Sequence, residues 1–357
     1  MTNPTTTPNF IAHLHAFRGF AILTIVAAHS WSLLLFSGDF MTMSGRNVVF
    51  AVAETLLHGS TIYFALISGL LFSLVLRRKG WKAFFKSKAL NVLVPYALVS
   101  LFFLSVFWPM YVQYFESQGM TTNFPVVFLN GLLKGTIMLP FWYIPVLMIL
   151  YFLTPIVDVL LNNRRLFWLA LVLLLLPLVV SRTTAPNFQS VQTVVYFLGA
   201  YTAGMLAGTH YRLVLGQIEK HLLPIWVAAL GCSAVALLLF LNEYVPGGPY
   251  SLVQTLVYVQ KLSIAALVLY YFSRHEESLP KILSTLGTYA FAIYFLHFFM
   301  VNAVARGVLV LTEGHVNAYT AAAGGLLILV GGTALSLFFS WLLKRLFRSK
   351  SRMVIGA

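Results

Sequence analysis

The sequence predicts an all-α integral membrane protein with about ten transmembrane helices and both termini in the cytoplasm. Its composition, its recurring apolar stretches and the placement of its basic residues each support this prediction. Of the 357 residues, 60% are hydrophobic and only 9% are charged, and the mean hydropathy is +0.87. Water-soluble domains contain a smaller share of apolar residues, whereas a stretch of about 20 apolar residues spans the hydrocarbon core of a bilayer.

The apolar stretches follow one another along almost the whole chain. They cover residues 18–37, 47–76, 89–110, 142–161, 166–181, 191–209, 222–242, 251–272, 285–305 and 318–343. A further segment, 126–139, is short and is interrupted by Lys134 and Gly135, so we expect a re-entrant or interfacial piece there. We divide the chain into a disordered cytoplasmic tail (1–12), one transmembrane domain (13–345) and a basic cytoplasmic tail (346–357).

The basic residues alternate between loops. With ten helices, most of the 23 Lys and Arg residues fall on one side of the membrane. The other side receives only Arg46, Lys134, Arg182 and Arg306, and we expect Arg46 and Arg182 to be solvated loop charges. Cytoplasmic loops carry such an excess of positive charge. The net charge of +14 therefore reflects topology and contact with membrane lipids, and it does not indicate nucleic-acid binding.

Arg18 and His29 are the first candidate functional residues. They lie in the first apolar stretch, about three helical turns apart, so they face the same way with a rise of roughly 16 Å between them. This places a cation near a membrane surface and an imidazole near the middle of the bilayer. An ionisable side chain inside a membrane is costly and therefore indicates function, although His29 also fits a helix-packing histidine.

Four more polar side chains lie at a similar depth. Counting helical rise from the basic flanks places Ser68 about 14 Å deep, Lys261 about 20 Å deep, and Tyr294 and His297 roughly 20–24 Å deep. Each also has a structural interpretation. Ser68 with Gly69 fits a small-residue packing contact, Lys261 fits a pair with a backbone carbonyl, and His297 fits an aromatic core.

Two polar pairs lie nearer the other surface. Glu54 and His58 are spaced for an i, i+4 contact, and a straight helix would put Glu54 about 34 Å from the inner surface. Glu54 is then a poor direct partner for His29, unless the chain breaks at Gly59 and Ser60. Trp142 and Tyr143 open a later helix, where aromatic residues often lie at the membrane interface.

Several motifs together resemble the acyltransferase 3 family of bacterial multi-pass membrane O-acyltransferases that act on carbohydrates. They are Arg18-Gly19-Phe20-Ala21 leading to His29, Leu66-Ile67-Ser68-Gly69-Leu70-Leu71, Pro95-Tyr96, Trp142-Tyr143, and Tyr294 with His297. The resemblance covers 13–345. One departure is that the family's usual Arg-x-x-Arg pair is represented here by Lys88-Ala89-Leu90-Asn91.

The resemblance implies transfer of an acyl group, with acetyl expected, from cytoplasmic acyl-CoA to a carbohydrate hydroxyl outside the bacterial inner membrane. His29 would act as a general base or carry the acyl group transiently. Catalytic or oxyanion support would come from Ser68, Lys261, Tyr294, His297 or Glu54. Acyl-CoA would be bound by Arg18, Arg78, Lys86 and Lys88, and the carbohydrate or glycolipid acceptor would lie near Trp142 and Tyr143. We expect no metal and no tightly bound cofactor.

Two other classes compete with an enzyme. A transporter or flippase of a glycan or lipid-linked precursor would also have polar groups at mid-depth. However, the sequence shows no inverted repeat and no matched pair of interrupted helices. A membrane scaffold without activity would leave the shared face of Arg18 and His29 unexplained.

Overall fold

The computed structural model describes residues 11–36, 46–183, 190–242 and 250–357, and in these residues it contains helices and no strands. The helices are α1 (Ala12–Leu35), α2 (Arg46–Leu57), α3 (Thr61–Leu71), α4 (Trp81–Lys88), α5 (Val94–Val106), α6 (Trp108–Ser117), α7 (Phe124–Lys134), α8 (Tyr143–Asn162), α9 (Phe167–Leu175), α10 (Val191–Thr209), α11 (Tyr211–Lys220), α12 (Leu222–Leu241), α13 (Leu252–Arg274), α14 (Lys281–Thr288), α15 (Ala290–Leu311), α16 (Ala318–Phe347) and α17 (Ser351–Ile355). The fold is therefore all-α, as the sequence predicts.

Short segments of 3-10 helix or π-helix join several of these α-helices. Two π-helical turns, Phe72–Leu76 and Ala89–Leu93, follow α3 and α4. Turns of 3-10 helix cover Arg77–Lys79, Leu139–Trp142, Leu176–Leu178, Glu276–Ser278 and Arg348–Lys350. A helix keeps its backbone hydrogen bonds within the segment, which is why a chain in lipid stays helical across such joints.

Nine of the described segments are long and apolar enough to cross a membrane. They account for nine of the ten predicted stretches. The tenth, 166–181, is the shorter apolar helix Phe167–Leu178, because Pro177 and a 3-10 turn end it early. The predicted interfacial segment 126–139 contains α7, which ends at Gly135 in a left-handed conformation. Length and apolar composition together make this a multi-pass membrane protein.

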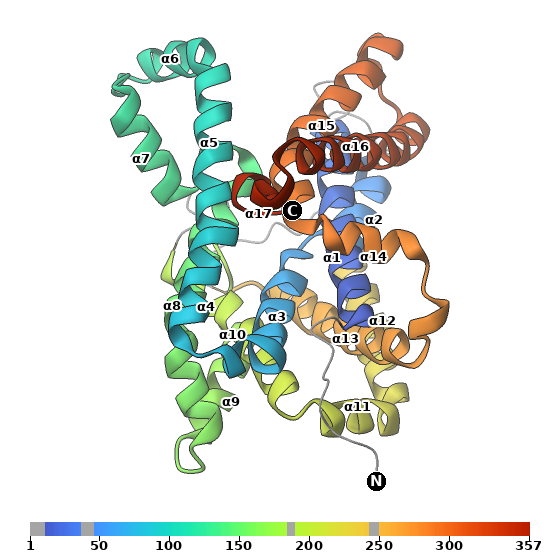
Figure 1. Ribbon diagram of the computed structural model, residues 1–357. Coiled ribbons are helices and arrows are strands. Elements are labelled where there is room, and N and C mark those ends of the chain that lie inside the picture. Colours follow the sequence, from blue (N-terminus) through green and yellow to red (C-terminus); the bar gives the residue numbers. More distant parts are fainter. Residues whose placement is uncertain (1–10, 37–45, 184–189, 243–249) are drawn as a thin grey trace.

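The first helix lies inside the bundle, in contact with α2, α3, α13, α14, α15 and α16. Figure 1 shows α1 beside α2 and α14, with α15 and α16 crossing it toward one end. Its closest neighbour is α14. A Cβ atom on Gly19 would lie 1.9 Å from the Leu283 carbonyl oxygen, and one on Gly287 would lie 1.8 Å from the His15 carbonyl oxygen. Glycine at both positions allows the two backbones to touch.

The predicted stretch 47–76 is broken rather than straight. Residues 58–60 form a turn between α2 and α3, and Gly59 adopts a φ of +75° there. This conformation is open to glycine and strained for other residues. The break moves the end of α2 off the axis of α3, so a depth counted along one straight helix does not apply to Glu54.

Parts of both predicted tails are helical. Residues 1–10 of the predicted disordered tail lie outside the described part; of its last two residues, Ile11 is the N-cap of α1 and Ala12 is the first residue of that helix. Within 346–357, α16 continues to Phe347 and a turn at Arg348 leads into α17, which packs against α5 and α16. Figure 1 shows α17 lying beside α5, near the middle of the molecule.

Candidate functional site

The imidazoles of His29 on α1 and His297 on α15 lie side by side. Their ring centroids are 5.2 Å apart, with 44° between the ring planes. His297 is fully buried, whereas His29 is half-buried. The edge-to-face ring of Phe298, 5.5 Å from His29, closes one flank of the pair. The two residues that the sequence places at a common depth are thus brought together.

The hydrogen bonds of His297 determine which of its nitrogens is available. Its Nδ1 lies 2.8 Å from the Tyr294 carbonyl oxygen and 3.1 Å from the Ile293 carbonyl oxygen. Two carbonyl acceptors require a proton on Nδ1, so the neutral ring keeps its lone pair on Nε2. That Nε2 is buried and has no hydrogen-bond partner among the described residues. His297 therefore places a free acceptor nitrogen in the same region as His29.

A chain of contacts lies on the His29 side of α1, away from Arg18. It joins Glu54, His58 and Arg182. The carboxylate of Glu54 lies 3.1 Å from His58 Nδ1, and Arg182 donates a hydrogen bond to His58 Nε2. The guanidinium of Arg182 also lies 6.0 Å from the ring centroid of Trp142. His58 interacts electrostatically with His29, which links this group to the histidine pair. We call Glu54, His58, Trp142 and Arg182 the Glu54 cluster.

Arg182 is not the solvated loop charge that the sequence predicts. Its side chain is half-buried and contacts His58 and Trp142. Burial lowers the pKa of its guanidinium, while the neighbouring Tyr196 and Glu54 favour the charged form. The prediction was wrong because Arg182 meets side chains from two distant segments, which a count of residues along the chain does not reveal.

Lys261 has the structural role that the sequence allows as an alternative. Its Nζ donates to the Leu56 carbonyl oxygen at 2.8 Å, and the neighbouring Gln260 donates to the Thr55 carbonyl oxygen at 3.1 Å. Both acceptors belong to the last turn of α2, whose carbonyls have no intrahelical partner because the helix breaks at Gly59. Lys261 also interacts electrostatically with Glu54, so it borders the Glu54 cluster.

A second group of cations lies around Arg18. The Arg18 guanidinium lies 6.0 Å from the ring centroid of Phe291, and it interacts electrostatically with Tyr151 and Arg352. The ammonium of Lys88 lies 4.3 Å from the ring centroid of Tyr151. The Tyr151 hydroxyl is buried and has no hydrogen-bond partner among the described residues. We call Arg18, Lys88, Tyr151 and Arg352 the Arg18 cluster.

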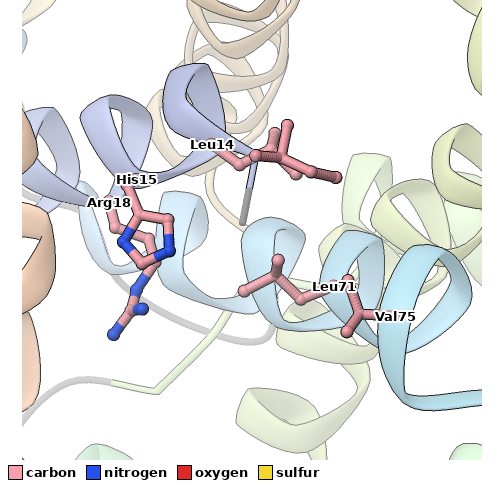
Figure 2. Close-up of a pocket in the computed structure, with 6 residues that line it drawn as sticks. Leu14, His15, Arg18, Leu71 and Val75 are labelled. Carbon is pink, nitrogen blue, oxygen red and sulfur yellow. The ribbon is translucent and has the colours of Figure 1, made fainter. Parts of the chain in front are cut away.

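A small cavity opens beside Arg18. Its volume is about 30 Å³, room for about two water molecules. It is lined by Ile11, Leu14, His15, Arg18, Leu71 and Val75. Figure 2 shows His15 and Arg18 on one helix and Leu71 and Val75 on the helix that faces it. The cavity marks a gap between α1 and the end of α3 rather than a complete ligand site.

The other residues that the sequence singles out lie around these groups. Tyr294 donates its hydroxyl to the Pro140 carbonyl oxygen, and its ring centroid is 5.9 Å from that of His297. Ser68 is buried on α3, and its neighbour Gly69 packs so closely on α10 that a Cβ would lie 2.1 Å from the Tyr201 carbonyl oxygen. The close α3–α10 contact at Gly69 is what a small-residue packing role predicts for this pair.

Three further candidates are Arg78, Lys86 and Tyr143. Arg78 and Lys86 are exposed, and among the described residues neither forms an ion pair with a carboxylate. Tyr143 is buried, and its hydroxyl has no hydrogen-bond partner among the described residues. Reasoning from the sequence predicted the i, i+4 contact of Glu54 with His58, and the structure confirms it. The same reasoning missed Tyr151 and Arg352, for which the sequence carries no local signal.

Comparison with known protein families gives a match to this chain. The family model Acyl_transf_3, described as an acyltransferase domain, matches residues 11–345, which is nearly the whole chain. No curated protein and no solved structure matches the chain significantly. Because this match covers residues 11–345, the chain belongs to the acyltransferase 3 family and is a multi-pass membrane acyltransferase.

Proposed function

We propose that this acyltransferase moves an acyl group, acetyl being the expected one, from cytoplasmic acyl-CoA to a hydroxyl of an extracytoplasmic carbohydrate. The membrane would be the inner membrane of a bacterium. The observation that carries the proposal is the His29–His297 pair, whose ring centroids are 5.2 Å apart and which lies between the Arg18 cluster and the Glu54 cluster. This order suits a donor that enters from one end and an acceptor from the other.

Two observations support a donor site near Arg18: the cations there, and the distance along α1 from Arg18 to His29. Arg18 and Lys88 are cations on α1 and α4 that lie around the same tyrosine. Charged groups of this kind bind phosphate strongly, and the phosphates of coenzyme A are at one end of the molecule. Arg18 and His29 share one helix, with a rise of roughly 16 Å between them. The extended pantetheine arm would follow that rise and bring the thioester to His29.

The chemistry then needs a base and an acceptor hydroxyl. Neutral His29 would take the hydroxyl proton while the hydroxyl oxygen attacks the thioester carbonyl carbon. The carbon–sulfur bond breaks, the ester forms, and the imidazolium returns the proton to the departing thiolate. In the other route, His29 attacks the thioester carbonyl carbon, the carbon–sulfur bond breaks and the coenzyme A thiolate leaves with the imidazole proton; the acceptor hydroxyl then attacks the acyl-imidazole, the carbon–nitrogen bond breaks, and the hydroxyl proton passes to the released imidazole. In both routes the Nε2 of His297 would be the second acceptor nitrogen for the moving proton.

The acceptor side would be the Glu54 cluster. The half-buried indole of Trp142 offers an apolar face of the kind that packs against a sugar ring. Arg182 and Glu54 place a donor and an acceptor of hydrogen bonds beside it, which is the pairing that hydroxyl groups need. A polysaccharide, an O-antigen or a lipid-linked sugar would meet these requirements equally.

The test compares His29→Asn with His210→Asn in cells that produce the full chain. His210 is an exposed histidine that ends α10, so it controls for the loss of an imidazole. Mass spectrometry of the surface glycans should show acylation with the wild-type protein and with His210→Asn, and none with His29→Asn at equal protein level. Full acylation in the His29 variant would end the proposal.

A further inference from the structure

We propose that helix α17 completes the donor's phosphate-binding site, with Arg352 acting as an additional cation beside Arg18 and Lys88. The inference rests on the proposed function, because it assigns a residue to binding of the same acyl-CoA. Helix α17 spans Ser351–Ile355, and the family match ends at residue 345. The family assignment therefore gives this helix no role.

The chain after α16 is folded back against the bundle. Arg348 adopts a φ of +48°, a conformation that non-glycine residues rarely take, and this reverses the chain. Ile355 and Ala357 are then buried, at 3% and 6% exposure, in a small apolar cluster with Ala292. Helix α17 also packs against α5 (Figure 1). The segment is thus docked by apolar burial rather than extended into solvent.

The docked helix reaches the surroundings of Arg18 through Phe291. A Cβ on Gly356 would lie 2.9 Å from the Phe291 Cβ and 3.7 Å from the Asn91 carbonyl oxygen. The same Phe291 ring has the Arg18 guanidinium 6.0 Å from its centroid. Asn91 lies one helical turn after Lys88. Packing therefore places the residues at the end of α17 between Phe291, whose ring Arg18 approaches, and the segment of Asn91 that follows Lys88, independently of any charge.

The charges themselves point to an anionic ligand. Arg352 interacts electrostatically with both Arg18 and His15, and all of these groups have the same sign when protonated. Among the described residues, none of Arg18, Lys88 and Arg352 forms an ion pair with a carboxylate. Like charges held together repel unless an anion binds between them.

Two neighbouring features separate this group from ordinary surface cations. Arg18 and Lys88 are half-buried, whereas the neighbouring basic residues without an ion pair in the described structure, Arg78, Lys79, Lys82 and Lys86, are exposed. Tyr151 is only 1% exposed, yet its hydroxyl has no hydrogen-bond partner in the described structure. A buried hydroxyl without a partner is costly, and a bound phosphate oxygen would satisfy it.

Coenzyme A supplies phosphates that need more than one cation. It carries a pyrophosphate and a 3′-phosphate, all remote from the thioester. Arg352 is exposed, so it is suited to the solvent-side phosphates, while the half-buried Arg18 is suited to the deeper ones. The planar guanidinium pairs with phosphate through two hydrogen bonds. Arg352 would therefore strengthen donor binding without touching the reacting carbonyl.

The experiment measures coenzyme A binding to the full chain in phosphatidylcholine nanodiscs by calorimetry. Arg352→Gln should weaken binding roughly 10-fold, the effect of losing a hydrogen bond to a charged group. Lys350→Gln removes the same charge from an exposed position two residues earlier and should leave binding unchanged. Binding of pantetheine, which lacks the phosphates, should be equal in both variants. Arg352→Lys should fall between wild type and Arg352→Gln.

The outcomes separate this inference from the proposed function. If Arg18→Gln weakens coenzyme A binding and Arg352→Gln behaves like Lys350→Gln, the role of Arg352 is overturned and the proposed function stands. If the wild-type protein binds no coenzyme A, the proposed function fails as well. Phosphatidylglycerol has the same phosphate chemistry, so the measurement is repeated in nanodiscs that contain it. If Arg352→Gln abolishes stabilisation by this lipid without changing coenzyme A affinity, the cation serves lipid headgroups and the inference is wrong.

Discussion

His297 Nδ1 is held by the Tyr294 and Ile293 carbonyl oxygens, and this leaves its Nε2 unpaired beside the imidazole of His29, with the ring centroids 5.2 Å apart. One histidine is thus fixed in a single tautomer by its own helix. The other comes from a helix at the opposite end of the sequence.

Replacing His297 by Phe should slow acyl transfer while donor binding is kept. The ring volume is retained, but the acceptor nitrogen is lost, and general acid–base groups contribute about 10²–10⁴-fold. We therefore expect kcat to fall by about 10²-fold or more, with an unchanged dissociation constant for coenzyme A. Single-turnover acylation and calorimetry on the same preparation measure the two quantities. An unchanged kcat would show that His297 only fills the core.

Replacing Arg182 by Gln should weaken acceptor binding specifically. Arg182 contacts His58 and Trp142 on the proposed acceptor side and is not part of the Arg18 cluster, so its loss should raise the KM for the acceptor about 10-fold and leave that for acyl-CoA unchanged. Arg306→Gln is the matched control, because Arg306 is an exposed arginine on α15. A rise in the KM for acyl-CoA instead would place Arg182 on the donor side.

Replacing Lys261 by Met should destabilise the fold rather than abolish the chemistry. The change removes the donor to the Leu56 carbonyl oxygen and a cation that interacts with Glu54. A buried acceptor without a partner costs about 1–3 kcal/mol, and the unfolding free energy should fall by that amount. Thermal unfolding in detergent measures it, with the exposed Lys134→Met as the reference. Equal unfolding of the two variants would contradict the role of Lys261 as a cap for α2.

Replacing Gly287 by Ala should separate α1 from α14. The new Cβ would lie 1.8 Å from the His15 carbonyl oxygen, and backbone cannot move aside as a flexible side chain can. We expect a loss of about 1–3 kcal/mol, the usual cost of overpacking. At Gly307 on α15 an added Cβ meets nothing within 4 Å, so Gly307→Ala should leave stability unchanged. The thermal unfolding temperatures of the two variants test the close contact between α1 and α14, and similar values would refute it.

Much of the helical framework follows from local sequence. In lipid, backbone groups must be satisfied within the segment, so long apolar stretches become helices wherever they occur. The shared face of Arg18 and His29 also follows, because helical periodicity alone sets it. Two boundaries were harder to predict. Helix α9 ends early at Pro177, and the break at Gly59 changes the direction of the chain, so depth along one axis misplaces Glu54.

Local sequence is enough to predict the class of the protein, its helices and the candidates on each helix. The packing of the chain brings His29 to His297 and Arg182 to His58, and it docks α17 against α5. Each of these contacts joins segments far apart in the chain. They depend on where small residues such as Gly19 and Gly287 let helices touch and on how the chain reverses at Arg348. Periodicity describes a helix face, whereas packing between helices decides what that face meets.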